Sequence, residues 1–521
     1  MIGGDVSRGK KSIFLKVLYI WSAVLSLLLM IVNACSAVSW IRQYPLKTVA
    51  MFAAVFAVFA LFLLLLAKSG IIMRIRSRKV FAAVLFLLSF ISKAVFTLVI
   101  KTPQYSDFQL FYWVTAEIAD GIQKYLTQTY YEIWAYQTGF PAAMAVFIKI
   151  FGKNVTALVL INCVFASLSN VLVYCLARLK AGEKTARTAG ILYLVFPFVM
   201  GISNVYTNQH LATLLFYCGL YVLMKFPKSN VIAPAVCGLL LALGNGIRPE
   251  GILFVAAFAA LLIYRFFADR GYKRGTRKAF LSGTALPVCT AVASYFICFM
   301  LLSNLFVITG LNPNGLKNNF PLYKFVVGLN HDTGGTFSSA DSKALFESDI
   351  VTRSEERDAE ALRLIRERLG QPKAKLARLF YSKINTMWTA QGIYPAFNPI
   401  MDKTAFRIGS ISVSVRRLNT LFTFVDYLIY ILLFGTILAG SAAGAAKNRE
   451  TIRPYFVLLF SAAFAVYLFI EVQYRYSYLL MPALLIMLSD GLEVFASKTK
   501  DGKNEAEKRG KGSKAAAGAY R

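Results

Sequence analysis

This sequence has few histidines, few acidic residues and no cysteine in a polar segment. Two histidines, His210 and His331, occur in 521 residues, which argues against a histidine-rich metal centre. All seven cysteines lie in apolar stretches, so the sequence predicts neither an extracellular disulfide framework nor a CxxC metal site. A P-loop, a Rossmann fingerprint and a nucleophile elbow are also lacking, and a cytosolic enzyme acting on ATP or a nucleotide sugar is therefore not supported.

Apolar residues and positive charge are abundant instead. Hydrophobic residues make up 57% of the chain and the mean hydropathy is +0.57, well above the values of soluble globular proteins. Lysine and arginine number 57 against 26 acidic residues, which gives a net charge of +31. The basic residues lie mostly in short loops between apolar runs of membrane length. This pattern is typical of a polytopic helical membrane protein with positive-inside loops that also contact anionic lipid headgroups.

Apolar runs predict about twelve transmembrane helices, within a range of eleven to thirteen. The runs are 13–41, 46–67, 79–100, 155–178, 185–202, 205–225, 231–247, 249–267, 279–304, 420–446, 453–470 and 474–496. The first run is too long for the core of a signal peptide, so we interpret it as an uncleaved span. Twelve spans with both chain ends inside place every basic loop in the cytoplasm. The apolar segment 139–152 is then an interfacial or re-entrant helix; if it crosses, the count is thirteen and the charge pattern fails downstream.

This topology predicts five parts and a polar outer face. The parts are N-terminal helices (1–78), a membrane core (79–304) with first outer loop 101–138, an outer loop (305–419), C-terminal helices (420–496) and a basic cytoplasmic tail (497–521). Polar residues that are not positive-inside anchors collect on the outer face. We therefore expect chemistry or binding outside the cell membrane.

Asp107 is the first carboxylate after three membrane-length segments, in the stretch Tyr105-Ser106-Asp107-Phe108. Apolar residues then recur at helical spacing to Ile122, which predicts an amphipathic interfacial helix with Asp107 at its N-terminus. Either Ser106 or Asp107 caps this helix, or Asp107 is a general base for an acceptor hydroxyl. The later acidic residues of the loop, Glu117, Asp120 and Glu132, are interpreted as solvated.

Arg248 stands at a break between two apolar runs, in Gly244-Asn245-Gly246-Ile247-Arg248-Pro249-Glu250-Gly251. Broken helices at membrane depth mark sites, and a charged residue there is a functional candidate. Arg248 is expected to bind a phosphate. The alternatives are a local pair with Glu250 or snorkelling to the headgroups.

Glu471 and Arg475 form a second charged group near the end of the chain. Their i,i+4 spacing predicts a pair on one helical face, with Tyr474, Tyr476 and Tyr478 as an interfacial aromatic belt. Otherwise Arg475 is a second phosphate ligand.

The outer loop 305–419 is expected to be mostly helical. Residues 354–369 predict a charged helix that ends at Gly370 and presents a solvated face. The pair His331-Asp332 is a minor candidate for a general base.

In order, these motifs resemble those of GT-C integral-membrane glycosyltransferases. The similarity is to family 39 enzymes, which are related to protein O-mannosyltransferases and lipid A aminoarabinose transferases. It is carried by Tyr105–Phe108, Ala116–Gly121, Gly139-Phe140-Pro141, Phe147–Gly152, Leu241–Pro249, Pro372–Trp388 and Gln473–Pro482. It covers most of residues 80–490, so the two N-terminal helices are additional.

The resemblance implies a cell-envelope transferase of hexosyl or pentosyl groups with a sugar on a polyprenyl phosphate as donor, and in-line attack on such a donor would invert the anomeric configuration. It implies that Asp107 is the catalytic base and that Arg248 and Arg475 bind the lipid phosphate. We expect substrate contacts from the remaining candidates, which are Tyr105, Asn208, Glu250, Glu471 and Tyr474. Many relatives carry a second acid directly after the base, where this chain has Phe108. No cofactor or metal site is expected, although a divalent metal is left open.

Two other interpretations remain. Broken helices and a buried arginine also suit a secondary transporter or lipid flippase, but no inverted repeat of spans is visible and the outer loop is long for a transporter. A polysaccharide polymerase or ligase with a diphosphate-linked donor shares the same catalytic logic. The expected partners are a polyprenyl-phosphate sugar, the bilayer and an acceptor glycan, wall polymer, lipid or protein, without nucleic acid.

Overall fold

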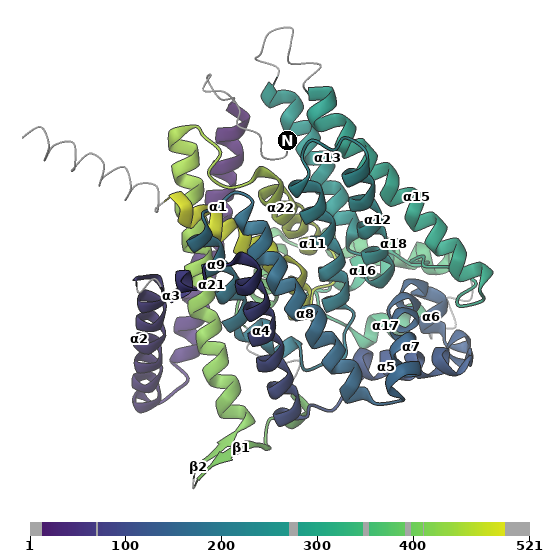
Figure 1. The fold of residues 1–521 in the computed structure, drawn as a ribbon. Helices are drawn as coiled ribbons and strands as arrows, with labels where there is room; N and C mark the ends of the chain where they lie inside the picture. The colour runs from purple at the N-terminus through teal and green to yellow at the C-terminus, as the bar shows by residue number, and fades with distance from the viewer. Residues whose placement is uncertain are drawn as a thin grey trace, which may run out of the picture.

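The computed structural model describes residues 13–68, 71–269, 280–346, 354–390, 398–409 and 411–494. The chain folds as an all-α polytopic membrane protein with one small hairpin (Figure 1). The first half contains α1 (Ile13–Ile41), α2 (Leu46–Lys68), α3 (Ile71–Arg74), α4 (Arg78–Ile100), α5 (Ser106–Asp120), η1 (Lys124–Thr127), α6 (Thr129–Ile133), η2 (Ala135–Thr138), α7 (Gly139–Phe151), α8 (Val155–Arg178), α9 (Glu183–Val195), α10 (Pro197–Ile202), α11 (Gln209–Lys225), α12 (Ile232–Ile247) and α13 (Gly251–Asp269). The second half contains η3 (Leu281–Ala285), α15 (Leu286–Ile308), α16 (Leu322–Gly328), α17 (Ser339–Phe346), α18 (Ser354–Leu369), α19 (Lys373–Trp388), η4 (Asn398–Ile400), β1 (Thr404–Ile408), β2 (Ile411–Ser414), α21 (Val415–Lys447), α22 (Pro454–Phe469) and η5 (Tyr474–Leu480), which continues as a helix to Val494.

Each of the twelve apolar runs is mostly helical in the part that the structure describes, and six of the described helices are long and apolar enough to cross a membrane alone. The run 185–202 is divided into α9 and α10 at Phe196, because Pro197 disfavours helical backbone in the residue before it. The next run begins as a helix only at Gln209, after a loop over 203–208. Helix α7 has 13 residues, about 20 Å at 1.5 Å per residue, which is shorter than a hydrocarbon core of about 30 Å.

Basic loops meet at one end of the bundle. Arg78 lies 3.3 Å from Glu183, Arg265 lies 3.0 Å from Glu450, and the Lys180 ammonium donates to the Thr451 carbonyl at 2.9 Å. Arg453 forms a buried pair with Asp490 at 2.9 Å. These contacts join four of the loops that the charge pattern assigns to the same side.

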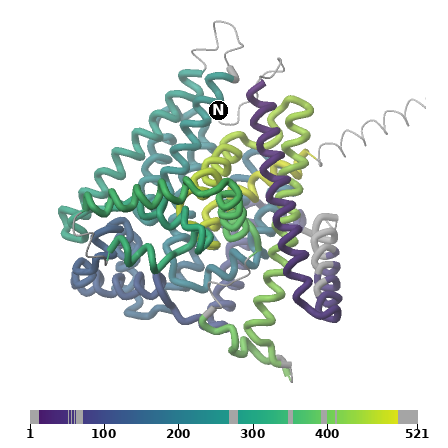
Figure 2. The backbone as a smooth tube through the Cα atoms, turned by 180° about the vertical axis from the view of Figure 1, so that it is seen from behind, coloured from purple at the N-terminus to yellow at the C-terminus, as the bar shows by residue number. Residues whose placement is uncertain are grey.

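The N-terminal helix α1 packs along α21 and is part of the core (Figures 1 and 2). The Tyr19 hydroxyl donates to the Ile452 carbonyl at 2.5 Å, and the hydroxyls of Ser22 and Ser441 are 2.8 Å apart. The Asn33 amide donates to the Trp388 carbonyl at 2.9 Å. Helix α1 therefore supports the loop segment as well as α21.

Segment 305–419 is mostly helical, as expected, and its helices lie across the bundle (Figure 2). Helix α18 has the predicted bounds, although Arg368 leaves the solvated face to pair with Asp341 at 2.6 Å. A β1–β2 hairpin, which the sequence analysis did not foresee, turns at Gly409 with φ of 59°.

The loop segment holds the short extended stretch between α22 and η5. The Glu471 amide donates to the Lys324 carbonyl at 2.7 Å, and the Val472 amide donates to the Gly335 carbonyl at 2.9 Å. The Lys383 ammonium is 1% exposed and donates to the carbonyls of Gly328, at 2.6 Å, and Ile470, at 2.8 Å. Three loop residues thus fix the backbone that leads to Arg475.

Candidate functional site

Asp107 lies in the first turn of α5 and caps nothing. The N-cap is Tyr105, whose side chain makes no capping hydrogen bond, so the prediction of a Ser106 or Asp107 cap is wrong. Ser106 has a φ of +50°, a conformation that is uncommon outside glycine, and it redirects the chain as the helix starts. The apolar face of α5 is buried at Phe108, Phe111 and Thr115, as its periodicity predicted.

Arg475 is the ion-pair partner of Asp107. Its Nη2 lies 2.5 Å from Oδ2 of Asp107, and the side chains are 10% and 32% exposed, respectively. Its Nε donates to Oε1 of Gln473 at 2.6 Å, and its backbone carbonyl accepts a hydrogen bond from the Gln209 amide. The guanidinium also lies 4.9 Å from the ring centre of Phe108. Phe108, the residue directly after Asp107, therefore packs against the cation that pairs with Asp107.

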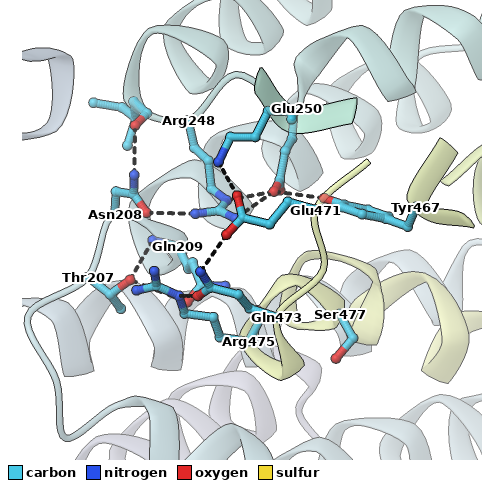
Figure 3. A network of polar contacts seen from close by, with 12 residues as sticks. Thr207, Asn208, Gln209, Arg248, Glu250, Tyr467, Glu471, Gln473, Arg475 and Ser477 are labelled. Carbon is cyan, nitrogen blue, oxygen red and sulfur yellow. Dashed lines mark hydrogen bonds and ion pairs between the residues drawn. The ribbon is translucent and has the colours of Figure 1, made fainter. Parts of the chain in front are cut away.

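Arg248 occupies the break between α12 and α13. Its Nη2 lies 2.7 Å from Oε1 of Glu250, and its Nη1 donates to Oδ1 of Asn208 at 3.2 Å (Figure 3). The Tyr467 hydroxyl donates to the same Glu250 oxygen at 3.0 Å, and the guanidinium lies 4.9 Å from the ring centre of Tyr476. The local Arg248–Glu250 pair considered from the sequence is present, and with 12% of its side chain exposed Arg248 does not snorkel into bulk solvent.

Glu471 pairs with Lys324 of α16 and not with Arg475, so the expected i,i+4 pair is wrong. The reason is that residues 470–473 are extended before the 3₁₀ helix, which removes the helical spacing. Gln473 bridges the two cations: its amide nitrogen donates to Oε1 of Glu471 at 2.9 Å while its oxygen accepts from Arg475. Lys324 escaped the sequence analysis because it is a single charge in the apolar stretch Pro321–Gly328.

Three cations and three carboxylates therefore alternate in one cluster: Asp107–Arg475, Glu250–Arg248 and Glu471–Lys324. Burial acts to raise the pKa of Asp107, but Arg475, and less strongly Lys324 and Arg248, hold that pKa below its ordinary value. Glu471 follows the same balance, because burial acts to raise its pKa and Lys324 lowers it below the ordinary value. Asp107 and Glu471 are thus anions in this site at neutral pH.

Tyrosines also line this cluster. Tyr130 and Tyr136 are within electrostatic reach of Asp107, and burial raises the pKa of both phenols, so both stay neutral donors. Tyr105 packs edge-on against Phe108 with ring centres 5.8 Å apart, and Tyr474 begins η5. Tyr478 does not join an interfacial belt, because it is fully buried and its hydroxyl lies 2.7 Å from Nδ1 of His210.

Other candidates lie outside the cluster. His331 Nε2 contacts the Arg368 carbonyl at 3.0 Å. In the first loop, Glu117 accepts from the Tyr125 amide at 2.8 Å and Asp120 pairs with Lys153 at 2.5 Å. Within the described ranges, no three His, Cys, Asp or Glu side chains gather in a way that suits a metal ion. The prediction on metals stays a prediction.

Comparisons with known proteins bear on this arrangement. Residues 139–297 match the model of the family described as dolichyl-phosphate-mannose-protein mannosyltransferase, which covers less than half of the chain and includes Arg248 but neither Asp107 nor Arg475. No curated protein matched.

Two solved structures match part of this chain. The archaeal oligosaccharyltransferase AglB from Archaeoglobus fulgidus, in complex with an inhibitory peptide and a dolichol-phosphate, is 12% identical over 81% of this chain and 51% of that one, with a TM-score of 0.44. The apo form of an Archaeoglobus fulgidus oligosaccharyltransferase is 12% identical over 81% of this chain and 52% of that one, with a TM-score of 0.37. The chain thus spans about half the length of these proteins. The family match confirms the resemblance expected from the motifs: residues 139–297 carry the features of a GT-C family of membrane mannosyltransferases.

Proposed function

We propose that the protein transfers a sugar from a polyprenyl-phosphate donor to an acceptor hydroxyl at the extracytoplasmic face of the cell membrane, with Asp107 as the general base. One observation carries the proposal. A partly exposed carboxylate lies in a buried cluster with two arginines, at the end of the bundle where helices break. The family match supports a glycosyl-transfer reaction, and the description of that family names a lipid-phosphate sugar.

The proposed reaction needs one base and cations for a leaving phosphate. Asp107 takes the proton of the acceptor hydroxyl as its oxygen attacks the anomeric carbon. The bond between that carbon and the phosphate oxygen breaks, and the electron pair leaves with the lipid phosphate. Arg248 and Arg475 stabilise the phosphate, and in-line attack inverts the anomeric configuration.

The charge distribution supports the orientation. The loops rich in arginine and lysine meet at the end of the bundle marked by Arg78, Arg265 and Arg453. Under the positive-inside rule that end faces the cytoplasm. We therefore assign 79–304 as the catalytic membrane core and 305–419 as an extracytoplasmic loop that completes the site through Lys324. In this assignment 1–78 are additional helices and 420–496 the C-terminal helices; the expected cytoplasmic tail 497–521 lies outside the described residues.

An Asp107→Asn variant tests the proposal. Purified protein in nanodiscs is supplied with polyprenyl-phosphate mannose and a membrane extract as acceptor source, and release of polyprenyl phosphate is measured. Loss of a general base is expected to lower turnover about 10²- to 10⁴-fold. Asp120→Asn is the matched control, because Asp120 lies on the same helix and pairs with Lys153 at the surface. Turnover by Asp107→Asn at the control's rate would remove Asp107 as the base.

A further inference from the structure

The side chain proposed as the base is already engaged by a cation proposed to hold the phosphate. The Arg475 guanidinium contacts Asp107 at 2.5 Å, whereas Arg248 is paired with Glu250 on the other side of the cluster. A carboxylate bonded to arginine is a weak base, because the pair favours its ionised form. The contact between Asp107 and Arg475 therefore opposes the proposed role of Asp107 as a base and occupies the cation that is proposed to bind the phosphate.

We propose, on the basis of the function above, that Arg475 is a shared cation: the donor phosphate draws it away from Asp107, so that the base is released only when the donor is bound. The site then couples two events. Arrival of the phosphate supplies a new anion for Arg475, and Asp107 becomes available to the acceptor hydroxyl.

The contacts of Arg475 allow this exchange. Its backbone is fixed through the carbonyl that accepts from Gln209, and its Nε is held by Gln473. Nη2 is the atom that donates to Asp107, whereas the contacts to Gln209 and Gln473 use other atoms of Arg475, so a change of partner at Nη2 can leave those contacts in place. The flat guanidinium can reach a phosphate as a bidentate donor.

The charge balance of the cluster favours this exchange of partners by Arg475. The three pairs of the cluster sum to zero, so a phosphodiester brings one uncompensated negative charge. Two anions around a single cation raise the pKa of Asp107, so the carboxylate becomes a stronger base while it stays ionised at neutral pH, and it takes up a proton only at lower pH. Among the described residues, the charged and titratable groups that face Asp107 are Arg475, Lys324, Arg248, Tyr130, Tyr131 and Tyr136. The three phenols remain neutral over this pH range, which leaves Asp107 as the group of this set that gains a proton when the pH is lowered with the donor bound.

Binding without chemistry tests this proposal. The probe is the methyl phosphodiester of a polyprenol, whose single charge does not titrate near neutral pH and which carries no sugar to transfer. Affinity for the full-length protein in nanodiscs is measured at pH 7. Asp107→Asn frees Arg475 and is expected to bind the probe about tenfold more tightly, within the usual size of a coupling between two sites. Asp120→Asn is expected to bind like wild type. Equal or weaker binding by Asp107→Asn would overturn the shared-cation proposal.

A measurement on the unmodified protein avoids any folding defect of the variant. Calorimetric titration with the same probe at pH 5, in two buffers of different ionisation enthalpy, gives the number of protons taken up per bound probe. Net uptake is expected, because Asp107 is ionised in the pair and gains a proton when Arg475 leaves. Zero uptake at pH 5 contradicts the proposal. Turnover by Asp107→Asn would contradict the base role instead, so the two failures are distinguishable.

Discussion

Replacing Lys383 with methionine should loosen the backbone that carries Arg475. The Lys383 ammonium is buried and donates to the carbonyls of Gly328 and Ile470 at 2.6 and 2.8 Å. Methionine has a similar length but no donor, so two buried carbonyls lose a partner. Each unsatisfied group costs about 1–3 kcal/mol, and the two together cost about 2–6 kcal/mol, partly offset by removal of a buried amine. At 1.4 kcal/mol per factor of ten, even the lower figure exceeds tenfold in a local equilibrium.

Thermal unfolding and donor turnover of purified protein in nanodiscs measure this effect. Lys383→Met is expected to lower the unfolding temperature and to lower kcat/KM for the donor about tenfold or more, because the Ile470 carbonyl that it releases lies in the extended segment that leads to Arg475. Lys373→Met is the matched control, since Lys373 is exposed in the first turn of the same helix. If Lys383→Met matches this control in both measurements, the loop does not hold the 470–475 segment in the way described.

The pH dependence of the stability difference between wild type and Lys383→Met distinguishes loss of this titrating amine from a general packing defect. Burial lowers the pKa of Lys383 to about 7, with only partial opposition from Glu471. Between about pH 7 and pH 10.4, the ordinary value for lysine, the unfolded chain binds a proton that the folded chain does not, so stability from this group rises with pH. Below pH 7 both states are protonated and the contribution is constant. The unfolding temperature of wild type relative to Lys383→Met should therefore increase from pH 7 to pH 9, and a constant difference would refute the linkage.

Two further substitutions test packing contacts of the helical bundle and whether they also affect the candidate site. Gly139→Ala should lower the folded yield and the unfolding temperature, since the new Cβ would overlap the backbone carbonyl of Gly246 next to the Arg248 break. Asp490→Asn should destabilise the protein by about 3–5 kcal/mol in thermal unfolding, because it leaves the buried Arg453 without its anion. The donor KM of the folded Asp490→Asn fraction should equal that of wild type; a large rise would show that this pair also shapes the site.

The sequence predicted the parts of the fold that depend on local pattern. Apolar runs gave α1, α4 and α8 almost to the residue, because a membrane-length apolar stretch has one low-energy conformation in lipid. The division between α9 and α10 at Pro197 was not predicted, because the residues on both sides are equally apolar and a hydropathy pattern does not reveal a break within an apolar run.

The candidate site was predicted residue by residue but not pair by pair. Asp107, Arg248 and Arg475 were recognised as charges beside apolar runs, and the structure brings them into one cluster. The local Arg248–Glu250 pair could be read from the sequence, but the Asp107–Arg475 and Glu471–Lys324 pairs depend on contacts between distant segments, which no spacing rule encodes. Glu471 shows this directly, because its helical spacing to Arg475 was real in sequence but the backbone there is extended and Lys324 lies closer.

The two members of the Asp107–Arg475 pair are 368 residues apart in the chain, one just after α4 and the other at the start of the final span. During synthesis the first loop is therefore in place long before its cation exists. The site is completed only when the last helices insert and dock, so a chain stopped before residue 475 carries an unpaired carboxylate and no complete site. Assembly of the whole bundle thus precedes completion of the charged cluster.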